Sequence, residues 1–200
     1  MSSNTVIHRI VRPAVRAIAP SGVTPNQITT LRLITGMAAA AAFAWDAGPW
    51  QDVGGIIFLL SMLLDRADGE LARQTGQSSP GGHRYDLLSD CFSNIIAFLG
   101  IGIGQMTNLG LTGLVLGAVA GAAIGALFWQ LHILMIGTLR GHDLAPGITI
   151  DPDDLLALVP LLIWIGATVP MLWAAAIITP AAALYLAIAG TRRARAGQRP

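Results

Sequence analysis

The segment DRADGELARQTGQSSPGGHRYDLLSD, residues 65–90, holds the main charged cluster of this 200-residue chain. It contains five of the eleven acidic residues and three of the twelve arginines. Apolar runs flank it at residues 54–64 and 91–104. Because charged side chains are costly near lipid, a charged cluster that leads into membrane helices is a candidate functional site by default.

The composition indicates an integral membrane protein of one domain, residues 1–200. Hydrophobic residues make up 54% of the chain and charged residues only 12%, whereas a soluble domain carries roughly a quarter charged residues. The net charge of +1 gives no basic surface of the kind that binds nucleic acid. The single cysteine, Cys91, excludes an intrachain disulfide.

Residues 4–19 have the pattern of a short amphipathic helix. Their apolar residues recur at helical spacing, and their three arginines fall on the opposite face. We expect this helix to lie in the membrane interface, with a solvated basic tail as the alternative. Pro13 predicts a kink or a break within it.

An all-α bundle of six transmembrane helices is predicted within residues 27–190. Thr24 and Pro25 are typical of a helix start. The second helix must continue past Asp65, because the apolar residues before it cover roughly 18 Å of a hydrocarbon core about 30 Å thick. The predicted helices are 27–45, 51–72, 83–105, 111–139 and a pair within 155–190 that is broken near 168–170, with polar loops at 74–82 and 140–154.

Gly117, Gly121 and Gly125 form a ridge of small residues on the predicted fourth helix. Such ridges allow helices to approach closely. The ridge is interpreted as a packing surface within the bundle or as the seam of a homodimer.

An even number of spans places both termini on one side of the membrane. That side then carries every arginine, whereas the opposite turns at 46–52, 105–110 and 168–170 carry none. The bias of arginine toward cytoplasmic loops predicts that the termini, the 65–90 segment and a basic tail at 191–200 face the cytoplasm. We therefore expect a multi-pass protein of the cell (inner) membrane.

The aspartates of the 65–90 segment are spaced for a shared site. Asp65 and Asp68 are three residues apart and Asp86 and Asp90 are four apart, so each pair shares a helix face. Two antiparallel helices joined by a tight loop would bring the four carboxylates to one point. Five acidic residues against three arginines leave the segment a formal charge of −2, which one divalent cation balances. All-oxygen ligands favour a hard ion such as Mg²⁺ or Mn²⁺.

The residues that follow the first aspartates suggest a ligand slot. Gly69 and Ala72 place almost no side chain on the helix, so a neighbouring helix or a flat ligand can approach it closely. Arg73 is a candidate partner for phosphate, and Gly81 and Gly82 are expected to give the loop conformational freedom or to allow a ligand to approach closely. Together these features suggest a site for a nucleotide diphosphate.

Eight residues at fixed spacing resemble the signature of the CDP-alcohol phosphotransferase family: Asp65-x2-Asp68-Gly69-x2-Ala72-Arg73-x8-Gly82-x3-Asp86-x3-Asp90. The expected six-helix layout and amphipathic start are also similar to that family. The resemblance implies metal-dependent transfer of a phosphate-linked group from a CDP-activated donor to an alcohol, with release of CMP. It implies that one or two Mg²⁺ or Mn²⁺ ions bind Asp65, Asp68, Asp86 and Asp90, that Asp90 is also the general base, and that Gly69, Ala72, Arg73 and Gly82 line the CDP pocket.

The resemblance leaves the substrates open. The first interpretation is a phospholipid-biosynthetic enzyme that moves a phosphatidyl group from CDP-diacylglycerol to a small polar alcohol such as inositol phosphate or glycerol phosphate. The alternatives are an enzyme that uses a soluble CDP-alcohol and a lipid acceptor, and a helical bundle that carries ions without catalysis.

A phosphorylated acceptor would need a basic pocket. Arg32 has two interpretations, since its side chain either snorkels to the surface or points inward at a phosphate. The candidate acceptor-binding residues are Arg140, Arg32, Arg84 and His83.

Overall fold

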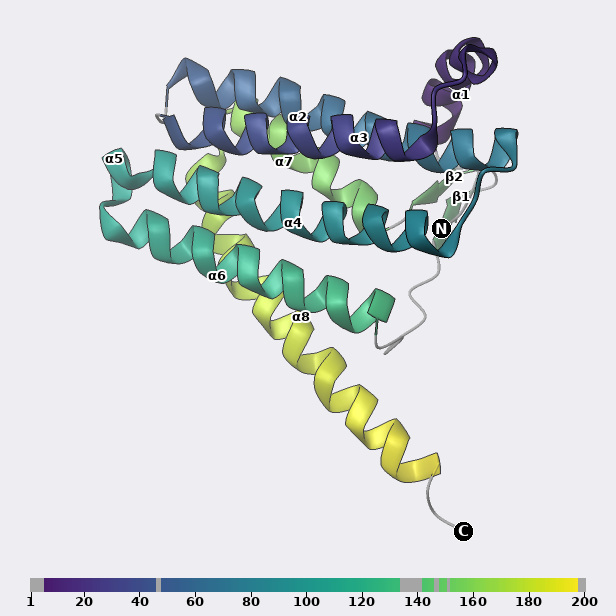
Figure 1. The fold of residues 1–200 in the computed structure, drawn as a ribbon. Coiled ribbons are helices and arrows are strands. Elements are labelled where there is room, and N and C mark those ends of the chain that lie inside the picture. The colour runs from purple at the N-terminus through teal and green to yellow at the C-terminus, as the bar shows by residue number, and fades with distance from the viewer. Residues whose placement is uncertain (1–5, 46–47, 134–141, 146–147, 151, 198–200) are drawn as a thin grey trace.

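The structure, a computed structural model, describes residues 6–45, 48–133, 142–145, 148–150 and 152–197 (Figure 1). Its elements in chain order are α1 (Val6–Ile18), η1 (Ala19–Ser21), α2 (Pro25–Trp45), α3 (Pro49–Thr75), α4 (Pro80–Gly104), α5 (Met106–Leu109), α6 (Leu111–Phe128), η2 (Trp129–Ile133), β1 (His142–Ala145), β2 (Ile148–Ile150), η3 (Pro152–Ala157), α7 (Leu158–Trp164) and α8 (Thr168–Gly197).

The described part of the chain is helical apart from one short antiparallel hairpin of β1 and β2. Four of its helices are long and apolar enough to cross a membrane: Pro25–Trp45, Pro80–Gly104, Leu111–Leu131 and Thr168–Ala189. The prediction of a helical membrane protein is therefore confirmed. α3 carries the charged cluster and α7 has only 7 residues, so the count of six spans stays a prediction.

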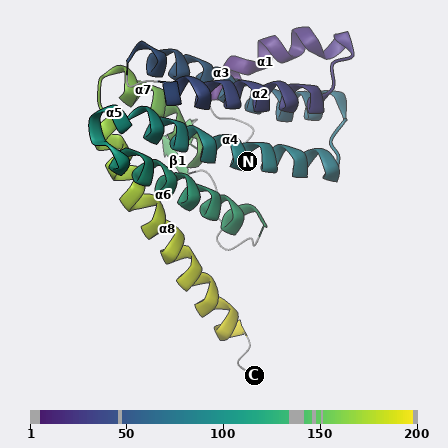
Figure 2. The ribbon, with the colours of Figure 1, turned by 60° about the vertical axis from the view of Figure 1, so that its left-hand side comes forward.

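The long helices pack as successive neighbours. α2 packs along both α3 and α4, α6 packs on α4, and α8 packs on α6. Figures 1 and 2 show α8 leaving the bundle toward the C-terminus, while α1 lies across the end at which α3 finishes. The largest buried side chains of the main core include Phe43, Phe58 and Ile101.

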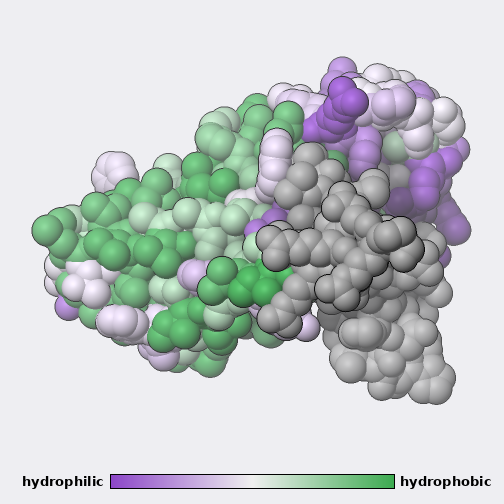
Figure 3. All heavy atoms as spheres, turned by 90° about the horizontal axis from the view of Figure 1, so that it is seen from below, coloured by the Kyte–Doolittle hydropathy of each residue, from purple (hydrophilic) through white to green (hydrophobic). Residues whose placement is uncertain are grey.

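The surface divides along the bundle. In Figure 3, apolar residues cover the left part of the face, and hydrophilic residues gather on the right, at the end where α3 stops and α4 starts. Exposed apolar side chains such as Ile56, Val115 and Ile177 are normal for helices that face lipid. The polar end is therefore the end that holds the charged segment.

α2 begins where Thr24 and Pro25 predict. The Thr24 N–H donates to Oε1 of Gln27 at 2.9 Å, and the Gln27 N–H donates to Oγ1 of Thr24 at 3.4 Å. These reciprocal bonds form a capping box, which satisfies two backbone N–H groups that the helix itself leaves unbonded. The cap fixes the first turn of α2 at the polar end.

The loop between α3 and α4 is shorter than the predicted 74–82. α3 continues to Thr75 and ends at Gly76, whose left-handed backbone (φ 67°) lets its N–H donate to the Ala72 carbonyl. α4 starts at Pro80, and the Ser79 hydroxyl accepts the Gly82 N–H at 3.0 Å. Gly81 and Gly82 therefore lie in the first turn of α4. Of the two expectations for them, loop freedom is not observed, and close approach of a ligand stays a prediction.

Other boundaries also differ from the predictions. α1 continues through Pro13 without a break, because Val11 and Val15 on one face of the helix are buried against α3. The predicted polar loop 140–154 includes the hairpin of β1 and β2. α8 runs to Gly197, so residues 191–197 are helical where a separate tail was predicted, in keeping with the helix propensity of alanine and arginine.

The predicted pair of helices within 155–190 is broken close to the expected place, and its first helix, α7, has 7 residues. This helix ends at Trp164, and Gly166 adopts a left-handed backbone (φ 75°) before α8 begins at Thr168. The predicted fourth helix is formed by α6 and a π-helical turn, Trp129–Ile133, and its remaining residues 134–139 lie outside the described part of the chain. The division of one domain into interfacial helix, bundle and tail stays a prediction.

The glycine ridge of α6 packs within the bundle. A Cβ atom at Gly117 would lie 2.5 Å from the Phe98 carbonyl oxygen, and one at Gly121 would lie 2.8 Å from that of Ile95. Gly125 faces the Ile95 side chain. Of the two interpretations, internal packing against α4 is therefore the one observed, and the ridge gives no support to a homodimer seam.

We predict that Gly117→Ala lowers the thermal unfolding midpoint of the protein in detergent. The added methyl group meets α4 backbone, and overpacking of this kind costs about 1–3 kcal/mol. Gly81→Ala is the matched control, because nothing lies within 4 Å of a Cβ at that helical position. An unchanged midpoint for Gly117→Ala would show that α4 and α6 can separate at no cost.

Candidate active site

Three aspartates converge at the polar end of the bundle. Asp65 of α3 and Asp86 and Asp90 of α4 each offer a carboxylate oxygen, and these oxygens all lie within 4.8 Å of one another. Asp90 is buried and the other two are half-buried. Carboxylates this close repel each other unless positive charge is supplied, and their oxygens are the ligands that hard divalent cations prefer.

Arg32 of α2 supplies part of that positive charge. Its side chain pairs with Asp90, and its Nε lies 3.1 Å from Oδ1 of Asp65. Arg32 is only 3% exposed, so the snorkelling interpretation is wrong. The side chain points inward as the alternative states, but toward the carboxylates.

Arg66 also contributes to the charge balance. Its Nη1 lies 3.5 Å from Oδ2 of Asp65, and the residue is buried. Two arginines therefore oppose the four aspartates of the signature, which again leaves a formal charge of −2. One divalent cation would balance this charge of −2, as the sequence predicts. Arg32 supplies part of the positive charge that the sequence analysis attributed to the arginines of the 65–90 segment alone.

Asp68 lies outside the three-aspartate group. Its Oδ2 accepts the Thr29 hydroxyl at 2.6 Å, and Thr29 also donates to the Pro25 carbonyl at 3.1 Å. Both Asp68 and Thr29 are buried. The prediction that all four carboxylates meet at one point is thus only partly met, because α2 comes close enough to give Asp68 a partner of its own.

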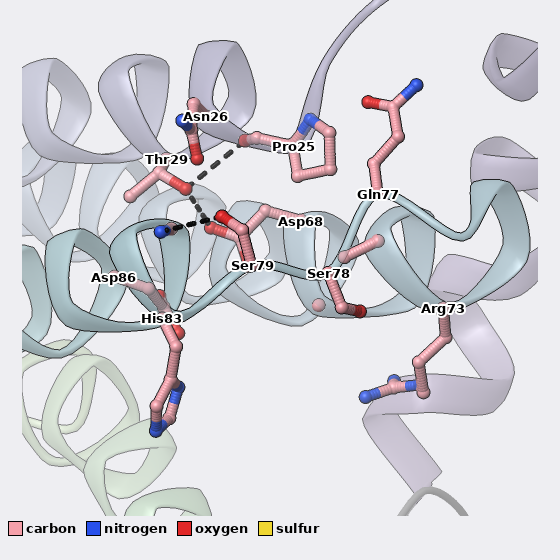
Figure 4. Close-up of a pocket in the computed structure, with 13 residues that line it drawn as sticks. Pro25, Asn26, Thr29, Asp68, Arg73, Gln77, Ser78, Ser79, His83 and Asp86 are labelled. Carbon is pink, nitrogen blue, oxygen red and sulfur yellow. Dashed lines mark hydrogen bonds between the residues drawn. The ribbon is translucent and has the colours of Figure 1, made fainter.

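A pocket of about 340 Å³ opens beside the aspartates (Figure 4). Helices α2, α3 and α4 and the connection between the last two form its walls. The lining residues are Pro25, Asn26, Thr29, Asp68, Gly69, Ala72, Arg73, Gln77, Ser78, Ser79, Gly82, His83 and Asp86. The four residues predicted to line the CDP pocket, Gly69, Ala72, Arg73 and Gly82, are among them, together with two of the predicted metal ligands, Asp68 and Asp86.

Gly69 leaves open space on the pocket wall, whereas Gly82 lies close to α2. A Cβ atom at Gly69 would have only Nη1 of Arg73 within 4 Å, at 3.7 Å. A Cβ at Gly82 would lie 3.1 Å from Oδ1 of Asn26 and from the Ser79 hydroxyl. Gly69 therefore faces the pocket instead of a neighbouring helix, which favours the ligand-slot interpretation over packing at that position.

Arg73 borders the pocket and pairs with Glu70. Its Nη2 donates to Oε2 of Glu70 at 2.9 Å, and the side chain is 44% exposed. An exposed guanidinium on one wall and carboxylates on another allow the pocket to hold an anionic ligand together with a cation.

The candidate acceptor-binding residues are found in different places. His83 lines the pocket and Arg84 is exposed next to it on α4. Arg32 is engaged with Asp65 and Asp90. Arg140 lies outside the described part of the chain.

Sequence analysis missed the polar residues that α2 contributes to the site. Asn26 and Thr29 line the pocket, and Thr29 is bonded to Asp68. The signal for them was present, since Pro25, Asn26 and Thr29 are spaced to share one face of the first helical turn. This spacing identifies residues of the site only once it is known that the shared helix face packs toward α3.

Comparison with known proteins agrees with these features. Residues 22–179 match the sequence model of a family described as CDP-alcohol phosphatidyltransferase. The chain is 33% identical over 101 residues to an archaetidylinositol phosphate synthase of Pyrococcus horikoshii, which covers 50% of this chain and 52% of the relative. It is also 33% identical over 85 residues to a bifunctional IPC transferase and DIPP synthase of Rubrobacter xylanophilus, covering 42% of this chain and 19% of the relative.

Among these curated relatives, the match spans about half the length of the archaeal protein and a smaller part of the bacterial one. The fold also resembles solved structures of the phosphatidylinositol phosphate synthase of Mycobacterium tuberculosis. The apo structure superposes with a TM-score of 0.65 at 19% identity, over 87% of this chain and 94% of that one. The structure with CDP-DAG bound gives 0.63 at 20% identity, over 94% and 92%. At these identities the likeness establishes the fold.

Proposed function

The chain belongs to the CDP-alcohol phosphatidyltransferase family, and we propose that it transfers a phosphatidyl group from CDP-diacylglycerol to the hydroxyl of a small polar alcohol, releasing CMP. The observation that carries this proposal is the pocket in which Gly69, Ala72, Arg73 and Gly82 lie beside Asp68 and Asp86. The similarity to an archaetidylinositol phosphate synthase and to a structure with CDP-DAG bound supports an inositol phosphate acceptor and this donor.

The donor's CDP group would occupy the pocket. Gly69 leaves room for a ligand against the backbone of α3, Gly82 borders the same pocket, and Arg73 could pair with phosphate. A pocket at the polar end of the bundle would let the acyl chains of the donor stay in the bilayer while its head group reaches water.

The aspartates would hold the metal. Asp65, Asp86 and Asp90 form the described cluster, Asp68 lies at the adjoining pocket wall, and their oxygens suit one or two Mg²⁺ or Mn²⁺ ions. When bound, the metal would supply positive charge for the pyrophosphate and for the leaving CMP.

Asp90 would be the general base. The acceptor hydroxyl gives its proton to Asp90 while its oxygen forms a bond to the phosphorus that carries the diacylglycerol. The bond from that phosphorus to the CMP oxygen breaks, and CMP leaves with the electron pair. Arg32 beside Asp90 would hold this carboxylate in place and oppose its charge.

The acceptor would approach from the exposed side of the pocket. His83 on the pocket wall and Arg84 next to it are the described candidates to contact an acceptor phosphate, with Arg140 as a further candidate. Arg32 is a weaker candidate because its guanidinium is already paired with two carboxylates.

The site would face the cytoplasm of a cell whose inner membrane holds the protein. The uneven distribution of arginines supports this orientation. The described arginines outside α8 belong to α1 or to the polar half of the bundle, whereas Trp45 and Trp50 lie at the other end. A homodimer is part of the proposal, with a seam other than the buried face of α6.

The direct test is CMP release by the purified protein in detergent, with Mg²⁺ or Mn²⁺, CDP-diacylglycerol and a panel of alcohols. We expect release with a phosphorylated polyol, and Asp90→Asn should reduce turnover by about 10²- to 10⁴-fold, the usual contribution of a general base. Asp52→Asn, at the far end of α3, is the control and should keep wild-type turnover. Release that requires a soluble CDP-alcohol and a lipid acceptor would replace the donor assignment, and full activity of Asp90→Asn would remove Asp90 as the base.

A second prediction concerns the slot. Gly69→Leu should weaken donor binding by at least about tenfold, since a bulky side chain would fill the space left for the ligand. The fold should tolerate the change, because that space is open, and the unfolding midpoint is the check. Gly69→Ala should have a smaller effect on the Kd of the donor, and normal donor affinity in Gly69→Leu would mean that the slot does not hold the donor.

A further inference from the structure

Glu70 of α3 is a buried carboxylate with three donors around it. Arg73 donates to its Oε2 at 2.9 Å, and Gln74 donates to its Oε1 at 2.9 Å. Arg12, from α1, places its Nε 3.3 Å from Oε1. Glu70 is only 7% exposed, so its charge needs partners within the protein.

The contact with Arg12 depends on how α1 is seated. Val11 and Val15 of α1 are buried against Ala67, about one turn before Glu70, and Leu71, the residue after it. This packing holds α1 across the end of α3 and brings Arg12 to the carboxylate (Figure 1). The ion pair is thus a consequence of the apolar contact between the two helices.

The Arg73 guanidinium has two candidate partners, the Glu70 carboxylate and the phosphates of the donor. Arg73 pairs with Glu70, and its guanidinium also lies over Gly69 at the pocket wall, where the donor's phosphates are proposed to bind (Figure 4). To pair fully with phosphate, the guanidinium must give up part of its bond to Glu70. If Arg73 were the sole cation beside it, that step would leave a buried charge without a counter-ion.

We propose that Arg12 is a positioning residue for the donor site: by sharing the charge of Glu70, it frees Arg73 to turn to the donor's phosphates. The inference rests on the proposed function and extends it. If Arg12 has this role, the packing of α1 on α3 contributes to substrate binding. The helix that is expected in the membrane interface is then coupled to the donor pocket.

The test is the dissociation constant of CDP in the presence of Mg²⁺, measured by calorimetry on the full chain in detergent. Arg12→Gln should weaken CDP binding about three- to fivefold, the scale of a half-exposed ion pair. Arg12→Lys keeps the charge and should restore most of the affinity. Arg16→Gln removes the same charge from the exposed face of α1 and should leave the affinity unchanged.

Glu70→Gln separates this mechanism from a general field effect. In that background there is no carboxylate charge to share, so adding Arg12→Gln should change the Kd of CDP by less than about twofold, even at low salt, where a long-range field effect would be largest. An equal loss in both backgrounds, or no loss for Arg12→Gln alone, overturns the inference. A wild-type protein that does not bind CDP at all overturns the proposed function, and the inference with it.

Discussion

The packing of α2 against both α3 and α4 is the constraint on which the site depends. Gly36 of α2 lies between Ser61 of α3 and Ser93 of α4, and a Cβ there would lie 2.6 Å from the Ser93 hydroxyl. Because no side chain separates the helices at this point, Arg32 and Thr29 reach the aspartates one and two turns closer to the polar end. Without Arg32 the cluster would hold buried carboxylates with too little opposing charge.

The same arrangement divides the protein into two environments. Apolar side chains face outward along the helices, whereas the aspartates are enclosed where α2 starts, α3 finishes and α4 starts (Figure 3). Ionisable groups near lipid are tolerated when they face the bundle interior and pair with one another, as Arg32, Asp65 and Asp90 do. The pocket beside them combines open backbone at Gly69 with an exposed guanidinium, an arrangement that suits a metal-bound pyrophosphate.

Much of this arrangement could be predicted from spacing and length. The thickness of the hydrocarbon core required α3 to pass Asp65, and the carboxylate spacing placed Asp86 and Asp90 on one helix face. The partners Arg32 and Thr29 could not be predicted, because they depend on which face of α2 meets the other helices. The sequence analysis also grouped Asp68 with the other three aspartates, because its hydrogen bond to Thr29 is a tertiary contact that spacing along the chain does not reveal. The hairpin of β1 and β2 was missed because its residues lack the alternation of a half-buried strand.

In our proposal, the aspartates and the pocket form one metal-dependent nucleotide site. Anomalous diffraction from crystals grown with Mn²⁺ and CDP would locate both ligands. We expect a manganese peak within about 2.5 Å of oxygens from Asp65 and Asp86, with the pyrophosphate of CDP over Gly69 and near Arg73. A manganese ion bound away from these aspartates, or CDP bound outside this pocket, would contradict it.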